Sequence, residues 1–260
     1  MNLSLYTSAT GMEAQQLQLN TIANNLANAN TIGYKRAKIE FQDMLYQRGR
    51  EAGAVSGDGN ELPTNIEMGN GTQVVSTARV FTQGSLRETG ARLDLAIDGP
   101  GFFEVELPDG ESGYTRDGAL KVASDGRITT SNGYPVLSNF QALPDGVESI
   151  SITPTGDVTV RSAQSVQTFR IQLVRFNNPA GLRSIGGNMY VETTGSGEAQ
   201  IGNPAENGYG RILQGYVESS NVNIVEEMVN MITAQRAYEI NSKAIQSSDE
   251  MLQVVGQLKR

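Results

Sequence analysis

The chain has 260 residues, of which 38% are hydrophobic and 29 are glycine, and its formal net charge is −8. It contains no cysteine and no histidine, so disulfides, thiolate nucleophiles and the commonest general base and metal ligand are all excluded. Non-specific nucleic-acid binding depends on clustered Lys and Arg, so the acidic balance argues against a nucleic-acid partner. We expect neither a cofactor nor a metal ion.

The chain opens with a heptad pattern that predicts a helix over the first 33 residues. Apolar residues recur at intervals of seven, with one more in the adjacent row: Leu5, Met12, Leu19, Leu26 and Ile22. Thr10 followed by Glu13 resembles a capping box, which predicts a start at Thr10 and a frayed segment before it. Gly33 predicts the end of the helix and, with Tyr34, a turn into a linker.

The same region favours neither a cleaved secretory signal nor a membrane span. The first residues lack a positive segment followed by an apolar core. From Ala14 to Tyr34 there is no charge, but Gln, Asn and Thr interrupt every apolar run. A protein with this N-terminus that works outside the cytoplasm is expected to leave by a route that reads no cleavable signal.

Amides stand on this helix where a solvated face would normally carry charge. Asn20, Asn24 and Asn28 form a row at intervals of four, and Asn25 lies beside them. Amides can satisfy one another across a close interface at a lower desolvation cost than charges. We therefore predict that Asn24, Asn25 and Asn28 contribute to contacts between subunits. The alternative is that these amides cap or solvate a single helix.

The middle of the chain has a different character. Residues 34–71, together with 214–221, predict an extended linking segment, and within it residues 46–64 are rich in glycine and polar residues. Residues 72–213 carry short alternating runs separated by Asp-Gly and Asn-Gly turns, which predict an all-β domain. Asp125-Gly126, for example, predicts a tight hairpin turn.

The C-terminus repeats the heptad pattern more strictly. Five apolar residues stand at intervals of seven: Ile224, Met231, Tyr238, Ile245 and Leu252. They predict a helix of roughly 35 residues, on the order of 50 Å long. Glu226 and Glu227 stand at the positive end of its dipole and Lys259 and Arg260 at the negative end. The fold predicted is mixed α and β: an inserted β domain, and a terminal helical domain (1–33 plus 222–260) paired as a coiled coil.

The sequence gives little support to an enzymatic or a ligand-binding function. Four carboxylates cluster in sequence, as glycoside hydrolysis would need: Asp94, Asp98, Glu104 and Glu106. In strand alternation, however, Glu104 and Glu106 share one face as like charges, which is ordinary for a solvated strand. The Asp-Gly pairs lack the spacing of a calcium loop. Gly99-Pro100-Gly101 lacks the lysine of a phosphate loop, so a turn is the better explanation.

Four motifs resemble the rod and hook family of the bacterial flagellum: NNLANANTIGYKR, LDLAIDGPGFFEV, YTRDG and QGYVESSNVNIVEEMVNMITAQRAYEINSKAIQSSDEML. The resemblance implies a structural subunit, not an enzyme, that polymerises helically into a hollow shaft. The terminal helices would form its inner tube and the β domain its outer layer. The interface residues would be the heptad and amide residues named above. The 46–64 segment would stiffen the shaft, and it favours a place in the distal rod.

The resemblance also implies partners and a location. The partners would be other copies of the chain, proximal rod proteins, the hook protein, the surrounding rings and the type III export apparatus. The shaft would cross the periplasm without inserting into a membrane. Two alternatives stay open: a proximal rod or hook protein of the same family and, more remotely, a non-flagellar binding module with a helical stalk.

Overall fold

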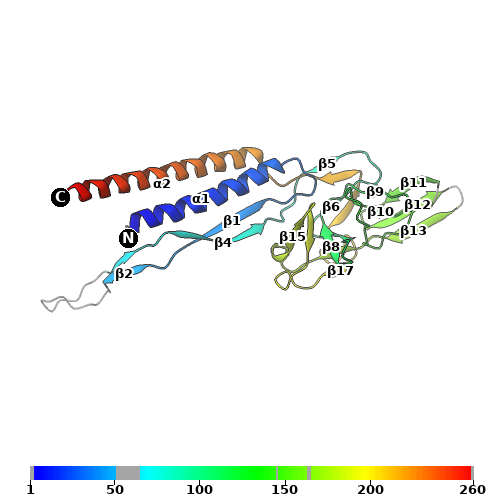
Figure 1. Ribbon diagram of the computed structural model, residues 1–260. Coiled ribbons are helices and arrows are strands. Elements are labelled where there is room, and N and C mark those ends of the chain that lie inside the picture. Colours follow the sequence, from blue (N-terminus) through cyan, green and yellow to red (C-terminus); the bar gives the residue numbers. More distant parts are fainter. Residues whose placement is uncertain (1–2, 51–64, 145, 163–164, 259–260) are drawn as a thin grey trace. The chain divides into compact units, whose positions relative to one another are not determined.

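The computed structural model describes residues 3–50, 65–144, 146–162 and 165–258 (Figure 1). Helix α1 (Leu3–Ala27) stands near one end of the chain and α2 (Ile224–Leu258) near the other, with strands between them. The predicted mixed architecture, with a β-rich region inserted between two terminal helices, is confirmed. The chain forms two compact units: Met1–Leu26, Ala37–Ala78 and Ile224–Arg260 make the first, and Ala27–Arg36 and Arg79–Asn223 the second.

The strands of the first unit are β1 (Ala37–Asp43), β2 (Gln47–Arg50), β3 (Ile66–Met68) and β4 (Thr72–Arg79, whose last residue belongs to the second unit). The second unit contains β5 (Leu86–Glu88), β6 (Leu95–Asp98), β7 (Phe103–Glu106), β8 (Ser112–Thr115), β9 (Lys121–Val122), β10 (Ile128–Thr129), β11 (Val147–Ile152), β12 (Asp157–Ser162), β13 (Val166–Arg170), β14 (Leu173–Arg175), a 3₁₀ turn (Pro179–Gly181), β15 (Arg183–Gly186), β16 (Met189–Val191), β17 (Gln200–Gly202), β18 (Arg211–Gln214) and β19 (Tyr216–Glu218).

Helix α1 begins earlier than its sequence predicts. It starts at Leu3, so the predicted start at Thr10 and the frayed segment before it are wrong. The hydroxyl of Thr10 donates to the carbonyl of Thr7 at 2.9 Å, and that of Thr7 donates to the carbonyl of Ser4 at 3.1 Å. These threonines therefore bond back into the preceding turn, as threonines inside a helix do, and do not cap its N-terminus.

Small and polar residues make close contacts between α1 and α2. The hydroxyls of Ser4 and Ser248 lie 3.1 Å apart, and a Cβ on Gly11 would lie 2.9 Å from Nδ2 of Asn241. The Asn25 amide donates to Glu227 at 3.3 Å. From one contact to the next, the residue number increases along α1 by seven or fourteen and decreases along α2 by the same amount. The helices are therefore antiparallel, and these three contacts are separated by multiples of seven residues along each helix.

One alanine of each helix is also buried. Ala14 and Ala234 are 3% and 2% exposed, and small side chains let two helices approach more closely than leucine or methionine would. The larger heptad residues of α2 flank the seam or point away from it. Ile224, Tyr238 and Leu252 remain 45%, 38% and 45% exposed in the chain.

Strands β1 and β4 pair as a two-stranded sheet in the same unit, and β2 pairs with β3 antiparallel. Gly71, just before β4, lies directly against Thr10 of α1, so the end of the β1–β4 pair packs on the helix. Of the 46–64 segment, residues 51–64 lie outside the described residues.

The second unit is built from short antiparallel pairings. A four-stranded sheet has the order β15-β16-β8-β7 and a three-stranded sheet the order β11-β12-β13, with two-stranded pairings beside them. Its main core includes Phe103, Val105, Val160 and Ile171, all 0% exposed. The hairpin predicted at Asp125-Gly126 is confirmed, because β9 pairs antiparallel with β10 and Gly126 has φ +79°. The predicted length of the C-terminal helix is also confirmed, at 35 residues.

Candidate assembly surface and the elements that support it

Asn25 of the NNLANANTIGYKR motif holds the exit of α1 in place. It is 1% exposed, and its side chain exchanges two hydrogen bonds of 2.9 Å with the backbone of Ala37, one as donor and one as acceptor. The same amide donates to Glu227 near the start of α2. One asparagine thus connects the end of α1, the first residue of β1 and the first turns of α2. In the isolated chain its contacts are internal.

The neighbouring amides behave differently. Asn24 is exposed and Asn28 half-buried. The Asn28 side-chain oxygen accepts from the Thr31 hydroxyl at 3.1 Å, and its carbonyl accepts from the Thr31 N–H at 3.1 Å. These two bonds close the turn that follows α1 and lead the chain toward Gly33.

Gly33 and Tyr34, the predicted turn residues, are both buried. Gly33 has φ +69°, and a Cβ there would lie 2.7 Å from the backbone nitrogen of Asp117. Its N–H donates to the carbonyl of Glu218 at 2.8 Å. The position therefore needs glycine twice, for its backbone conformation and for the close approach of another segment. Beside it, the guanidinium of Arg79 lies 5.1 Å from the centre of the Tyr34 ring.

Three buried charges, which our sequence analysis did not identify, lie together in the second unit. The Lys35 ammonium is 2.5 Å from one carboxylate oxygen of Glu218, and both side chains are 0% exposed. Nε of Arg116 is 3.6 Å from the other oxygen. Burial and the charge of Arg116 lower the pKa of Lys35, while Glu218 opposes that shift. Lys35, Arg116 and Glu218 lie in three of the four motifs that carry the family resemblance. Their place in these motifs is the one feature of the sequence that points to them.

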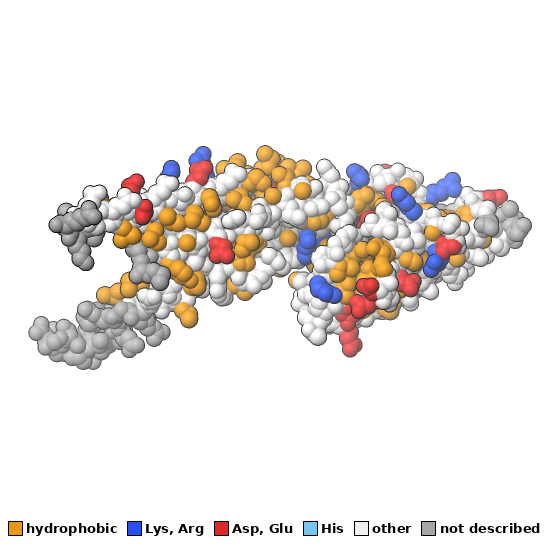
Figure 2. All heavy atoms as spheres, viewed as in Figure 1, with side chains coloured by type: hydrophobic (Ala, Val, Ile, Leu, Met, Phe, Trp, Pro, Cys, Tyr) orange, Lys and Arg blue, Asp and Glu red, His pale blue; other side chains and the backbone are white. Residues whose placement is uncertain are grey.

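Helix α2 carries an exposed apolar stripe on the side opposite its seam with α1. Val225, Met228, Val229 and Ile232 follow the spacing of one helix face and are 70%, 52%, 57% and 57% exposed. Ile232 lies two residues from the buried Ala234, which is roughly 200° around the helix axis. Figure 2 shows hydrophobic side chains gathered over these first turns of α2. We call these four residues the outer stripe.

The residues predicted for subunit contacts are distributed over all three degrees of burial. Ile22 and Asn25 are buried, and Asn24, Ile224, Tyr238 and Leu252 are exposed. The half-buried members are Leu5, Met12, Leu19, Leu26, Asn28, Met231 and Ile245. Their role between subunits stays a prediction. The outer stripe lies directly beside the strict heptad row in sequence, so periodicity alone does not distinguish it as a separate surface.

Three of the four clustered carboxylates have ordinary structural partners. Asp94 accepts from the Thr89 hydroxyl at 2.5 Å, Asp98 pairs with Arg211 at 2.7 Å, and Glu104 accepts from the Ser112 hydroxyl at 2.7 Å. Gly99 and Gly101 both have positive φ and form a turn between β6 and β7, not the start of a helix. In the described part of the chain, no helix is both long and apolar enough to cross a membrane.

Three protein-family profiles match the chain in order. Residues 5–35 match the flagella basal body rod protein, 96–160 the flagellar hook protein FlgE/F/G D1 domain, and 213–258 the flagellar basal body rod FlgEFG protein C-terminal region. Together they cover the exit of α1, part of the β-rich unit and all of α2. They define the class as a structural protein of the flagellar rod and hook.

Full-length relatives narrow the class. The chain is 46% identical to the flagellar basal-body rod protein FlgG of Borreliella burgdorferi, over 100% of both chains. It is 44% identical to that of Caulobacter vibrioides, over 98% of this chain and 99% of the relative. The flagellar hook-basal body complex protein FlhP of Bacillus subtilis is 31% identical over 98% and 99%. The chain belongs to the flagellar basal-body rod protein family: it is a structural component of the basal body, not an enzyme.

Proposed function

We propose that the chain is the subunit of the distal rod and that it polymerises helically into a hollow shaft. The shaft transmits torque from the motor to the hook and lets exported subunits pass. The observation that carries the proposal is the outer stripe. Four aliphatic or methionine side chains stand exposed on a helix whose opposite side already packs within the chain. An amphipathic helix with two packing sides is typical of a component that completes its core by association.

In this proposal the terminal helices pair as an antiparallel coiled coil within each subunit and form the inner tube. The serine pair Ser4–Ser248 and the Asn25–Glu227 bond support the pairing, because both lie in one heptad register. The outer stripe then packs against the helices of neighbouring copies. The exposed heptad residues Ile224, Tyr238 and Leu252 extend that contact along the helix.

The remaining parts follow the same scheme. Residues 1–33 with 222–260 form the helical domain, 34–71 with 214–221 the linking segment, and 72–213 the outer β domain. Neighbouring rod and hook proteins are partners through family membership. Proximal rod proteins, the hook protein, the rings and the type III export apparatus are the specific partners we propose. Export without a cleaved signal would bring the subunit to the periplasm.

The experiment that tests polymerisation uses a charge in the outer stripe. Ile232→Glu should raise the concentration needed for tube formation by more than tenfold, because burying an isoleucine contributes about 1.5–3 kcal/mol. The matched control is Ser247→Glu, which adds the same charge at an exposed position of α2 outside the stripe. Electron microscopy and sedimentation measure assembly, and circular dichroism checks that both variants fold. If Ile232→Glu forms tubes as readily as Ser247→Glu, the proposal is wrong.

The 46–64 segment gives a second test, of stiffness. We propose that it keeps the shaft straight, so its deletion should yield rods that bend. Curvature measured on isolated basal bodies reports the effect. If the chain without this segment still forms straight rods, the segment does not stiffen the shaft. The proposal that the chain polymerises would be unaffected by that result.

A further inference from the structure

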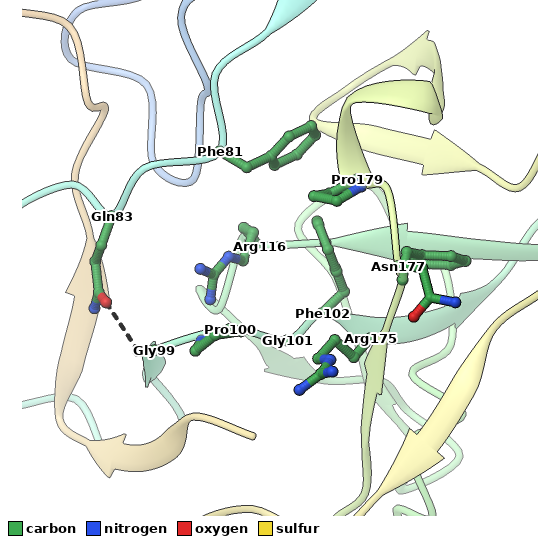
Figure 3. Close-up of a pocket in the computed structure, with 11 residues that line it drawn as sticks. Phe81, Gln83, Gly99, Pro100, Gly101, Phe102, Arg116, Arg175, Asn177 and Pro179 are labelled. Carbon is green, nitrogen blue, oxygen red and sulfur yellow. Dashed lines mark hydrogen bonds between the residues drawn. The ribbon is translucent and has the colours of Figure 1, made fainter. Parts of the chain in front are cut away.

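The second unit contains a cavity of about 500 Å³. The proposed role of the chain as a shaft subunit gives no reason for this cavity. Figure 3 shows the side chains around it. Phe102 and Phe176 supply an apolar wall, and Pro100 and Gly101 lie at its edge. Two arginines, Arg116 and Arg175, also line the cavity. A space of this size, apolar with a few convergent polar groups, is typical of a site for a small ligand or an inserted side chain.

Arg116 carries the argument. It is 4% exposed, and its Nε and Nη1 atoms have no hydrogen-bond partner among the described residues. Nε keeps only a loose ion pair of 3.6 Å with Glu218, so Nη1 is left with neither kind of contact. A buried guanidinium nitrogen without a partner is costly, since the group loses its hydration and gains nothing in return.

The charges around Arg116 do not balance. Glu218 is the carboxylate of the cluster, and its other oxygen already accepts from Lys35 and from the backbone N–H of Gly84, at 2.5 and 2.9 Å. Two buried cations therefore share one buried anion. An anion in the adjacent cavity would offset the excess positive charge and supply acceptors for the guanidinium.

Arg175 provides a second cation on the same cavity. It is half-buried and forms no salt bridge with any described residue; its guanidinium lies 5.7 Å from the centre of the Tyr209 ring. Figure 3 shows the side chains of Arg116 and Arg175 both directed into the open space near Pro100. The Arg116 guanidinium also lies 5.6 Å from the centre of the Phe102 ring. The aromatic wall is held by edge-to-face contacts, with Phe102 and Phe176 centroids 5.9 Å apart.

We propose that this cavity is a binding site for a carboxylate attached to an apolar body, with Arg116 and Arg175 as its cationic contacts and Phe102 and Phe176 as its wall. A planar guanidinium matches the two oxygens of a carboxylate, and the rings accept an apolar group behind it. The carboxylate can come from an acidic side chain of a second copy or from a free organic acid. The site itself does not depend on polymerisation.

The first experiment titrates the full chain, at a concentration where it is monomeric, with benzoate. Isothermal calorimetry measures affinity, and NMR shifts report where the probe binds. Benzamide, which has the same ring without the charge, and inorganic phosphate, which has charge without an apolar body, are the comparison ligands. We expect benzoate to bind at least tenfold more tightly than either. Equal binding of benzamide, equal or tighter binding of phosphate, or shifts confined to residues away from the cavity would each overturn the proposal.

Variants locate the site. Arg175→Gln should weaken benzoate binding at least tenfold, whereas Arg183→Gln, an exposed arginine of β15, should leave it unchanged. Arg116→Gln should abolish binding, but it alters a buried ion cluster and counts only if circular dichroism shows a native fold. Arg175→Gln carries the test if that variant unfolds. Unchanged affinity in Arg175→Gln would contradict the assignment.

A last arm separates the two sources of carboxylate. If saturating benzoate inhibits tube formation, and Arg175→Gln also weakens tube formation, the natural occupant is a carboxylate of a second copy. If benzoate binds to the monomer and to formed tubes alike, without affecting assembly, the occupant is a free organic acid.

Discussion

Asn25 and Glu227 lie 202 residues apart in the chain, yet the amide of one donates a 3.3 Å hydrogen bond to the carboxylate of the other. Glu227 is 2% exposed, so the bond is shielded from water. It fixes the register of α1 against α2 at the end where the chain leaves α1 and enters α2. Charge-assisted bonds in such a shielded setting are among the stronger ones available to a protein.

The first prediction concerns this bond. Asn25→Ala removes one partner of Glu227 and the side-chain partner of both backbone groups of Ala37. Each buried group left unsatisfied costs about 1–3 kcal/mol, so the free energy of unfolding should fall by about 2–4 kcal/mol. Urea denaturation followed by circular dichroism measures it. Asn20→Ala, at an exposed position of the same helix, should change stability by less than about 0.5 kcal/mol. Equal stability of the two variants would show that the bond contributes little.

The second prediction concerns the buried charges. Glu218→Gln leaves Lys35 and Arg116 without a counter-charge in a site where the side chains of Lys35 and Glu218 are 0% exposed. Breaking a buried ion pair from one side costs about 3–5 kcal/mol, and the midpoint of thermal unfolding should fall accordingly. Glu111→Gln, which removes an exposed carboxylate from the same unit, serves as the control. If Glu218→Gln is as stable as the Glu111→Gln control, the negative charge of Glu218 does not stabilise the fold.

The third prediction tests why Gly33 is glycine. Gly33→Ala adds a side chain at φ +69° and within 2.7 Å of a backbone nitrogen. The backbone strain costs about 1–2 kcal/mol and the overpacking about 1–3 kcal/mol more. Gly110→Ala is the informative comparison, because Gly110 has φ +79° but no atom within 4 Å of an added Cβ. The difference between the two variants in chemical denaturation isolates the steric part, and no difference would mean that the backbone gives way at Gly33.

The fourth prediction is a pH dependence. Burial raises the pKa of Asp117 above its ordinary value of 3.8, a shift that a backbone hydrogen bond from Ala119 opposes and the charge of Asp94 supports. The folded state therefore holds this proton more tightly than the unfolded state. The stability that Asp117 contributes is fully present below pH 3.8 and is lost as the pH rises through the folded-state pKa.

Asp117→Asn removes this titration while keeping an oxygen that can accept the 3.0 Å bond from the Ala119 N–H. The variant should therefore gain stability relative to the parent chain at neutral pH, and the gain should vanish below pH 3.8. Urea midpoints between pH 3 and 7 measure the difference. Asp109→Asn, in an exposed turn, should follow the parent at every pH. A gain that persists at acid pH would assign the effect to something other than the Asp117 charge.

Local periodicity was enough to predict several elements from sequence alone. The 35-residue C-terminal helix, the Asp125-Gly126 hairpin and the inserted β-rich region depend on spacing within a short stretch, which is readable from the chain. The start of α1 was misjudged because Thr10 and Glu13 have the residue types of a capping box, although Thr10 bonds to the carbonyl of Thr7 inside the helix. A capping pattern therefore does not determine where a helix starts when the residues before it can also adopt a helical conformation.

The sequence by itself determined that two heptad helices flank a β-rich region, and its motifs determined the family, because both are encoded in local order. Only the tertiary structure decided which row of each helix faces the other. The contacts Ser4–Ser248, Gly11–Asn241 and Asn25–Glu227 each join residues of two helices far apart in the chain, so no single helix contains that information. It also decided that Lys35, Arg116 and Glu218 share one buried site. Such a cluster depends on segments far apart in the chain meeting where water is excluded, so no spacing along the chain can encode it.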